Sequence, residues 1–203
     1  MKRRLLAVLV ALFGFSMCYG IASAQGAPGV RFGVFGGADF PVQDQKDVFK
    51  TGWNAGALLA FNFGDAPLGL RFDGLYSELK TADALQLFFG NGKTRIIAGE
   101  GDLVIGPRFA GGFQPYVMGG VGVYDLRFRG QEVDTGNVFS DTTTKFGWNA
   151  GTGFAFPLGA GNSRIFVEGK YVSVSTNGNR FADTITTHGS RFTIVPVNLG
   201  FIF

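Results

Sequence analysis

This sequence predicts an all-β fold in which eight strands run up and down, pair antiparallel and close into a transmembrane barrel. Three observations carry the prediction: a C-terminal segment with alternating faces, eight such segments joined by connections of alternating length, and an internal repeat. Closure removes the unpaired edges that a sheet would otherwise expose. A lipid-facing wall also needs an apolar residue at every second position.

Residues 1–24 precede the barrel and predict a secretory signal peptide that is cleaved, leaving residues 25–203 as the barrel domain. A basic stretch at residues 2–4 is followed by the apolar run 5–15 and by the small residues 22–24. This order is typical of signal peptides. The apolar run is shorter than the roughly 20 residues that a membrane-spanning helix needs.

The charge balance and the cysteine content exclude several classes of function. The chain has 18 Lys and Arg against 15 Asp and Glu, and three of the basic residues belong to the leader. The remaining charges balance, so no nucleic-acid partner is expected. The single cysteine, Cys18, also lies in the leader, and Met17 before it does not fit a lipid-anchor motif. We therefore expect no disulfide, no metal site and no cofactor.

Eight alternating segments follow the leader, each close to the length that a tilted membrane strand needs. In chain order they are Val30–Phe40, Gly52–Phe63, Leu68–Leu79, Thr94–Ile105, Pro115–Phe128, Lys145–Phe156, Arg164–Ser175 and Arg191–Phe203. In the last segment, one face carries Val195, Val197, Leu199, Phe201 and Phe203.

The connections between these segments alternate in length. Those at 41–51, 80–93, 129–144 and 176–190 are long and polar, whereas the other three are short. Long outer loops and short periplasmic turns are the usual asymmetry of outer-membrane barrels. The long loops are the expected contacts for an extracellular ligand or surface. Loop 80–93 adds an apolar stretch with Leu87, Phe88 and Phe89, a candidate contact site.

An internal repeat supports the count of eight. The five residues Gly52–Gly56 recur as Gly147–Gly151, an offset of 95, and the same offset aligns Tyr76 with Tyr171 and Asp73 with Glu168. Each copy spans a strand, a short turn and a second strand. Two four-stranded halves make eight strands.

The repeat also assigns the two faces of the strands. Trp53, Tyr76, Trp148 and Tyr171 face outward near the outer rim, where aromatic rings form a girdle against lipid headgroups. Six charged residues face inward: Arg71, Asp73, Glu100, Asp102, Glu168 and Lys170. Side chains fill the lumen of an eight-stranded barrel, so these charges must pair with one another. The alternative interpretation is an ion path.

The segment Pro115–Gly122 resembles the fifth strand of the outer membrane protein β-barrel domain family. The whole mature chain resembles the small eight-stranded outer-membrane barrels, among them the OmpA transmembrane domain and the OmpX and Ail group. The last strand, with Phe201 and Phe203, resembles the C-terminal signal that the barrel-assembly machinery reads. The resemblance implies a bacterial outer-membrane location, contact with outer-membrane lipid and a structural network of lumen charges.

For function, we expect a non-enzymatic barrel with a structural role or a loop-mediated, adhesion-like surface interaction. A small pore is the alternative. A lipid-modifying enzyme is a weaker one: His188 and Ser190 have the spacing seen in lipid A deacylases, but no acidic residue follows Asp183 to orient the histidine.

Deleting Phe203 is expected to impair membrane assembly more than stability, because the resemblance makes this residue part of the assembly signal. The precursor should still be exported and cleaved, while the amount of folded barrel in the membrane should fall. Fractionation followed by immunoblotting measures both quantities. Equal membrane levels of the deletion variant and the parent would contradict the prediction.

Overall fold

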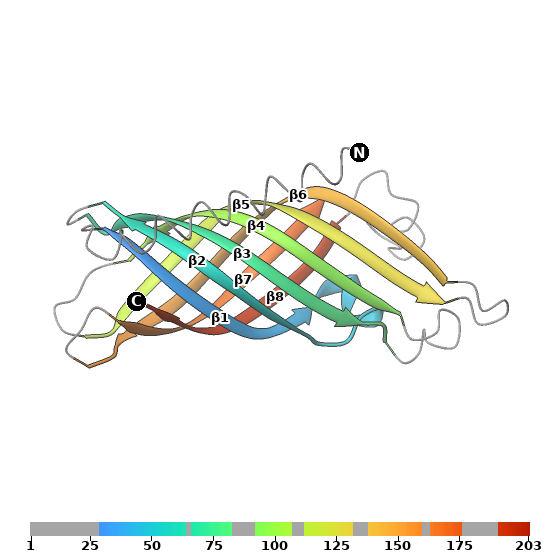
Figure 1. The fold of residues 1–203 in the computed structure, drawn as a ribbon, viewed down its shortest axis with the longest axis horizontal. Coiled ribbons are helices and arrows are strands. Elements are labelled where there is room, and N and C mark those ends of the chain that lie inside the picture. The colour runs from blue at the N-terminus through green and yellow to red at the C-terminus, as the bar shows by residue number, and fades with distance from the viewer. Residues whose placement is uncertain are drawn as a thin grey trace.

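Eight strands pair in chain order and close into a barrel, because the last strand pairs with the first (Figure 1). The computed structural model describes residues 29–63, 66–82, 92–106, 112–131, 138–159, 163–175 and 191–203. Every neighbouring pair of strands is antiparallel. The predicted eight-stranded up-and-down barrel is confirmed.

The strands lie close to the predicted segments, with one exception. Their bounds are β1 Val30–Pro41, β2 Gly52–Asn62, β3 Leu68–Lys80, β4 Lys93–Ile105, β5 Gln114–Gln131, β6 Val138–Pro157, β7 Arg164–Ser175 and β8 Arg191–Ile202. A short 3-10 helix, η1, spans Gln43–Asp47 between β1 and β2. No helix among the described residues is long and apolar enough to cross a membrane.

The exception is the hairpin of β5 and β6, where the predicted loop 129–144 is wrong. The two strands stay paired as far as Gln131 and Val138, so only residues 132–137 connect them. This extension lacks the apolar alternation that marks a lipid-facing strand, which is why the pattern missed it. Its β-branched Thr142, Thr143 and Thr144 nevertheless favour extended backbone.

The two ends of the barrel differ. The end with the connections at 63–67, 106–113 and 158–163 is called the turn end, and the opposite end, at the right of Figure 1, is called the loop end. Between them the wall alternates as a membrane barrel requires. On β2, for example, Trp53 is 51% exposed and points outward, whereas Asn54 is 4% exposed and points into the lumen.

Side chains fill the described lumen in three layers. Near the turn end, Phe35, Leu58, Ala155 and Phe166 form one buried apolar cluster. Charged residues occupy the middle. Near the loop end lies a second apolar cluster of Val48, Phe49, Leu79, Ile96, Ala98, Tyr124, Val172, Val174, Phe192 and Ile194.

The connection between β1 and β2 supplies part of the layer at the loop end. Val48 and Phe49 of this connection are buried, and the Phe49 ring packs edge-on against Phe192 of β8. Backbone hydrogen bonds fix the segment to the end of β3: Lys50 N–H donates to Lys80 O at 2.9 Å, and Ala82 N–H donates to Val48 O at 2.8 Å. The first loop therefore folds inward as a cap.

Local packing predicts different outcomes for two glycines, Gly200 on the lumen face and Gly169 on the outer face. A Cβ at Gly200, on β8, would collide with the Phe166 ring, whereas a Cβ at Gly169, on β7, would meet no atom within 4 Å. Overpacking a filled core costs about 1–3 kcal/mol. We therefore expect Gly200→Ala to lower the free energy of unfolding by about that amount, and Gly169→Ala to change it by less than about 0.5 kcal/mol.

Urea unfolding of the barrel in detergent, followed by tryptophan fluorescence, measures both changes. A Cβ at Gly200 would also lie 2.6 Å from the backbone oxygen of Val34. Equal stability of the two variants would therefore show that both the Phe166 ring and this backbone can move.

Candidate functional site

The six predicted inward charges lie together in the middle layer of the lumen. Arg71 and Asp73 come from β3, Glu100 and Asp102 from β4, and Glu168 and Lys170 from β7. Each residue is at most 4% exposed. Strands β3 and β4 are neighbours, whereas β7 lies across the barrel. The cluster therefore joins opposite walls.

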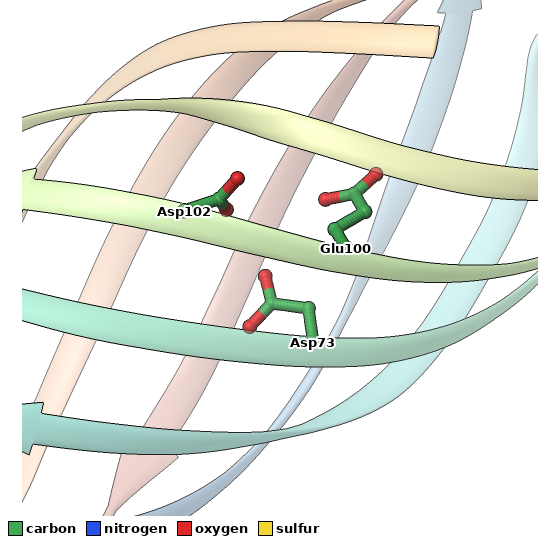
Figure 2. Close-up of side chains that lie close together, drawn as sticks. All are labelled: Asp73, Glu100 and Asp102. Atoms are coloured by element: carbon green, nitrogen blue, oxygen red, sulfur yellow. The ribbon is translucent and has the colours of Figure 1, made fainter. Parts of the chain in front are cut away.

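The ammonium group of Lys170 lies between three carboxylates of the opposite wall. Its Nζ donates to Asp73 Oδ2 at 2.6 Å, to Glu100 Oε2 at 2.8 Å and to Asp102 Oδ2 at 3.0 Å. Figure 2 shows these three carboxylates, which reach toward one another from β3 and β4. A lysine ammonium has three donors, so this arrangement uses all of them.

Arg71 makes the reciprocal crossing from β3 to β7. Its Nη1 and Nη2 donate to the two oxygens of Glu168 at 2.6 and 2.9 Å, and its Nε donates to Asp73 Oδ1 at 2.6 Å. The guanidinium also lies over the rings of Phe35 and Phe166, 5.8 and 5.3 Å from their centroids. A bidentate ion pair with two aromatic contacts fixes the plane and position of this group.

Neutral donors complete the cluster, which has four carboxylates for two cations. Tyr124 Oη donates to Glu100 and Tyr116 Oη donates to Glu168, each at 2.8 Å. Asn149 Nδ2 donates to Asp102 at 2.8 Å, and Asn198 Nδ2 donates to Glu168 at 3.4 Å. These bonds stabilise the surplus negative charge that the cations leave. Sequence patterns placed the strands of these donors but did not indicate their partners.

A smaller polar group, missed by the sequence reasoning, surrounds Asp39 of β1. Asp39 is fully buried and accepts hydrogen bonds from Ser77 Oγ and from Asn54 Nδ2, the latter at 2.7 Å. Asn54 and Asn149 are equivalent in the repeat, and each donates to an aspartate. The alternation of β1 indicates that Asp39 faces inward, because Asp39 is four residues from the inward Phe35 and shares its face.

The cluster leaves little space for chemistry. Oxygens of Asp73, Glu100 and Asp102 lie within 4.8 Å of one another, close enough to hold a metal ion. The Lys170 ammonium occupies that position through its three short ion pairs. The cavity beside Glu100 and Lys170 measures about 10 Å³, about the space of one water molecule, and so cannot admit a substrate.

The other predicted residues lie outside this cluster. Trp53 contacts Tyr76, and Trp148 contacts Tyr171, with ring centroids 5.5 Å apart in both pairs. In β8 and just after it, Phe201 and Phe203 are 42% and 58% exposed, and Phe203 N–H donates to Phe32 O at 2.8 Å. Leu87, Phe88, Phe89, His188 and Ser190 lie outside the described residues.

Removing the central cation tests the energetics of the cluster. We expect Lys170→Met to lower the free energy of unfolding by about 3–5 kcal/mol, because three buried carboxylates lose their shared partner. Glu100→Gln is the matched control. It keeps the shape and lowers the surplus negative charge, so its cost should stay near 1 kcal/mol. Urea unfolding in detergent measures both values, and a larger loss for Glu100→Gln would refute the assigned roles.

Comparisons with known proteins identify the family and the fold. The family model for the outer membrane protein β-barrel domain matches residues 7–203. No curated protein sequence matches the chain. Among solved structures, a major outer membrane protein from Thermus thermophilus is 12% identical, with a TM-score of 0.53 over 86% of this chain and 98% of that one. This likeness shows the fold.

Two further structures have lower scores. The attachment invasion locus protein Ail of Yersinia pestis is 14% identical, with a TM-score of 0.49 over 86% of this chain and 99% of that one. OprG of Pseudomonas aeruginosa is 13% identical, with a TM-score of 0.48 over 88% and 98%. From the family match and the closed barrel, the chain belongs to the outer membrane protein β-barrel domain family and is a protein of the bacterial outer membrane.

Proposed function

We propose that this barrel has a sealed lumen and no enzymatic activity. It acts through its loop end at the cell surface, in a structural or adhesion-like role. The observation that carries the proposal is the pair of cations that cross the lumen. Lys170 and Arg71 reach from opposite walls into one hydrogen-bonded cluster, which fills the cross-section where a solute would have to pass.

The layers on either side of the cluster support a closed lumen. Toward the loop end, the apolar cluster around Leu79 and Ile96 is buried, and Val48 and Phe49 of the first loop pack into it. Apolar layers of this kind offer a permeating ion no compensation for its lost hydration. Every carboxylate of the ionic cluster also has a cation or a neutral donor as partner, so none of these carboxylates is free to act as an acid or base.

The first loop supports a surface role, because hydrogen bonds attach it to the barrel. Gln43 Nε2 donates to Tyr171 Oη at 2.9 Å, Gln45 Nε2 donates to Arg191 O at 3.1 Å, and Val42 N–H donates to Thr193 O at 3.3 Å. Lys46 and Asp47 remain exposed on this loop. A surface that is ordered before binding loses less entropy when a partner docks.

A small pore is the second candidate, and one observation favours it. A hollow of about 110 Å³ enters the lumen from the turn end and reaches Arg71, with Arg31 and Arg164 also on its lining. The ionic cluster would then be a gate, opened when Arg71 or Lys170 changes partner.

Planar-bilayer recordings separate the two candidates. The sealed barrel should give no steady conductance, and Asp73→Ala and Glu168→Ala should lower the free energy of unfolding by about 3–5 kcal/mol because each leaves a buried cation short of a partner. Glu78→Ala is the control, since Glu78 pairs with Lys93 and Arg95 on the outer wall. Its removal should leave both quantities near the parental values.

A pore predicts a different pattern. The parent would conduct steadily, and Asp73→Ala and Glu168→Ala, but not Glu78→Ala, would alter the ion selectivity. This result would make the cluster a gate and overturn the proposal of a sealed lumen.

A further inference from the structure

The outer wall of the barrel carries a basic hollow near the loop end, which the sequence reasoning did not anticipate. The hollow measures about 220 Å³, and its lining residues are Tyr76, Lys93, Arg95, Ile97, Arg127 and Arg129. They come from β3, β4 and β5, three neighbouring strands. This site is separate from the lumen, so it stands whether or not the lumen conducts.

Strand register explains why the cations gather here. Arg95 pairs with Arg127 across β4 and β5. Lys93 pairs with Arg129, two residues nearer the loop end on each strand and on the same outward face. Residues two apart share a face of a strand and lie about 7 Å apart. Lys93, Arg95 and Arg127 have side chains 50%, 41% and 52% exposed. Four cations thus project from one small area of the wall.

The acidic residues beside the hollow neutralise it only in part. Glu78 accepts ion pairs from Lys93 Nζ at 3.2 Å and from Arg95 Nε at 3.3 Å, and Asp125 accepts one from Arg127 Nε at 3.0 Å. Arg129 has no carboxylate partner in the part of the chain that the structure describes. Two carboxylates against four cations leave a net positive charge. Exposed ion pairs are weak, so these groups can turn toward an incoming anion at little cost.

The position of the hollow indicates what kind of anion fits. Tyr76 lies on the side of the hollow that is further from the loop end, paired with Ile97. It belongs to the aromatic pair with Trp53, which marks the headgroup level of the membrane. Ile97 is 49% exposed on the lipid-facing side. A molecule in the hollow would meet apolar surface toward the membrane and cations away from it. That polarity matches a lipid with an anionic headgroup.

We propose that this hollow binds the phosphate groups of a phosphorylated glycolipid in the outer leaflet. Guanidinium groups donate two parallel hydrogen bonds to phosphate, and Arg95, Arg127 and Arg129 supply three such groups within one hollow. Basic side chains at the membrane surface attract anionic lipids in the same way. The lateral opening of the hollow, on the wall rather than over the barrel mouth, favours a lipid over a soluble polyanion.

The test measures lipid binding to the folded full-length barrel by native mass spectrometry from mixed micelles. The probes are a bisphosphorylated glycolipid and the same glycolipid after phosphatase treatment. The parent should prefer the phosphorylated form. The triple variant Arg95→Gln/Arg127→Gln/Arg129→Gln should bind it about a hundredfold more weakly, since each lost charge is worth about fivefold. Heat-modifiable gel migration checks that the variant is folded.

Two control variants and two competitors complete the design. Arg191→Gln removes an exposed arginine on β8, across the barrel from β4, and should bind as the parent does. The matching triple Arg→Lys variant keeps the charge and should retain most of the binding. Equal binding of the dephosphorylated glycolipid, or undiminished binding by the triple Gln variant, would overturn the site. Tighter binding of inorganic phosphate or a sulfated polysaccharide would overturn the lipid assignment.

Discussion

Two buried cations that cross the lumen in opposite directions connect the walls of this barrel. Lys170 reaches from β7 to carboxylates on β3 and β4, and Arg71 reaches from β3 to Glu168 on β7. A buried charge without a partner is strongly destabilising, so each wall depends on the other. The crossing is possible only because eight strands enclose a narrow lumen. In a wider barrel the same side chains would not meet.

The internal repeat accounts for part of this arrangement, and departures from it account for the rest. Asp73 and Glu168 are equivalent in the two halves, as are Asn54 and Asn149 and the two Trp–Tyr pairs. The cations have no such equivalents, because Arg71 aligns with Phe166 and Lys170 aligns with Leu75. The Phe166 ring lies against the Arg71 guanidinium. Arg71 and Phe166 thus occupy equivalent positions in the two halves, and their contact joins the halves.

The alternation of residues is enough to predict the barrel, the strand count and the faces, because a side-chain period of two is the same in every strand of a membrane barrel. It cannot predict which inward charges pair, since that depends on register across the lumen. It also misses the ends of β5 and β6, where polar residues on both faces hide the strand pattern. The basic hollow escapes prediction for the same reason, because the pattern assigns Arg129 and Lys93 to loops.

Two clusters of six charged groups each thus have opposite properties in this molecule. Inside the lumen, short ion pairs fix the partners of Arg71 and Lys170, and exchange would leave a charge unpaired in a medium of low polarity. On the outer wall, Arg95 and Arg127 keep access to solvent, their ion pairs are weak, and an incoming anion can replace the carboxylates. Because it is buried, the first cluster stabilises the barrel and cannot exchange its partners. Exposure leaves the groups of the second cluster able to exchange partners.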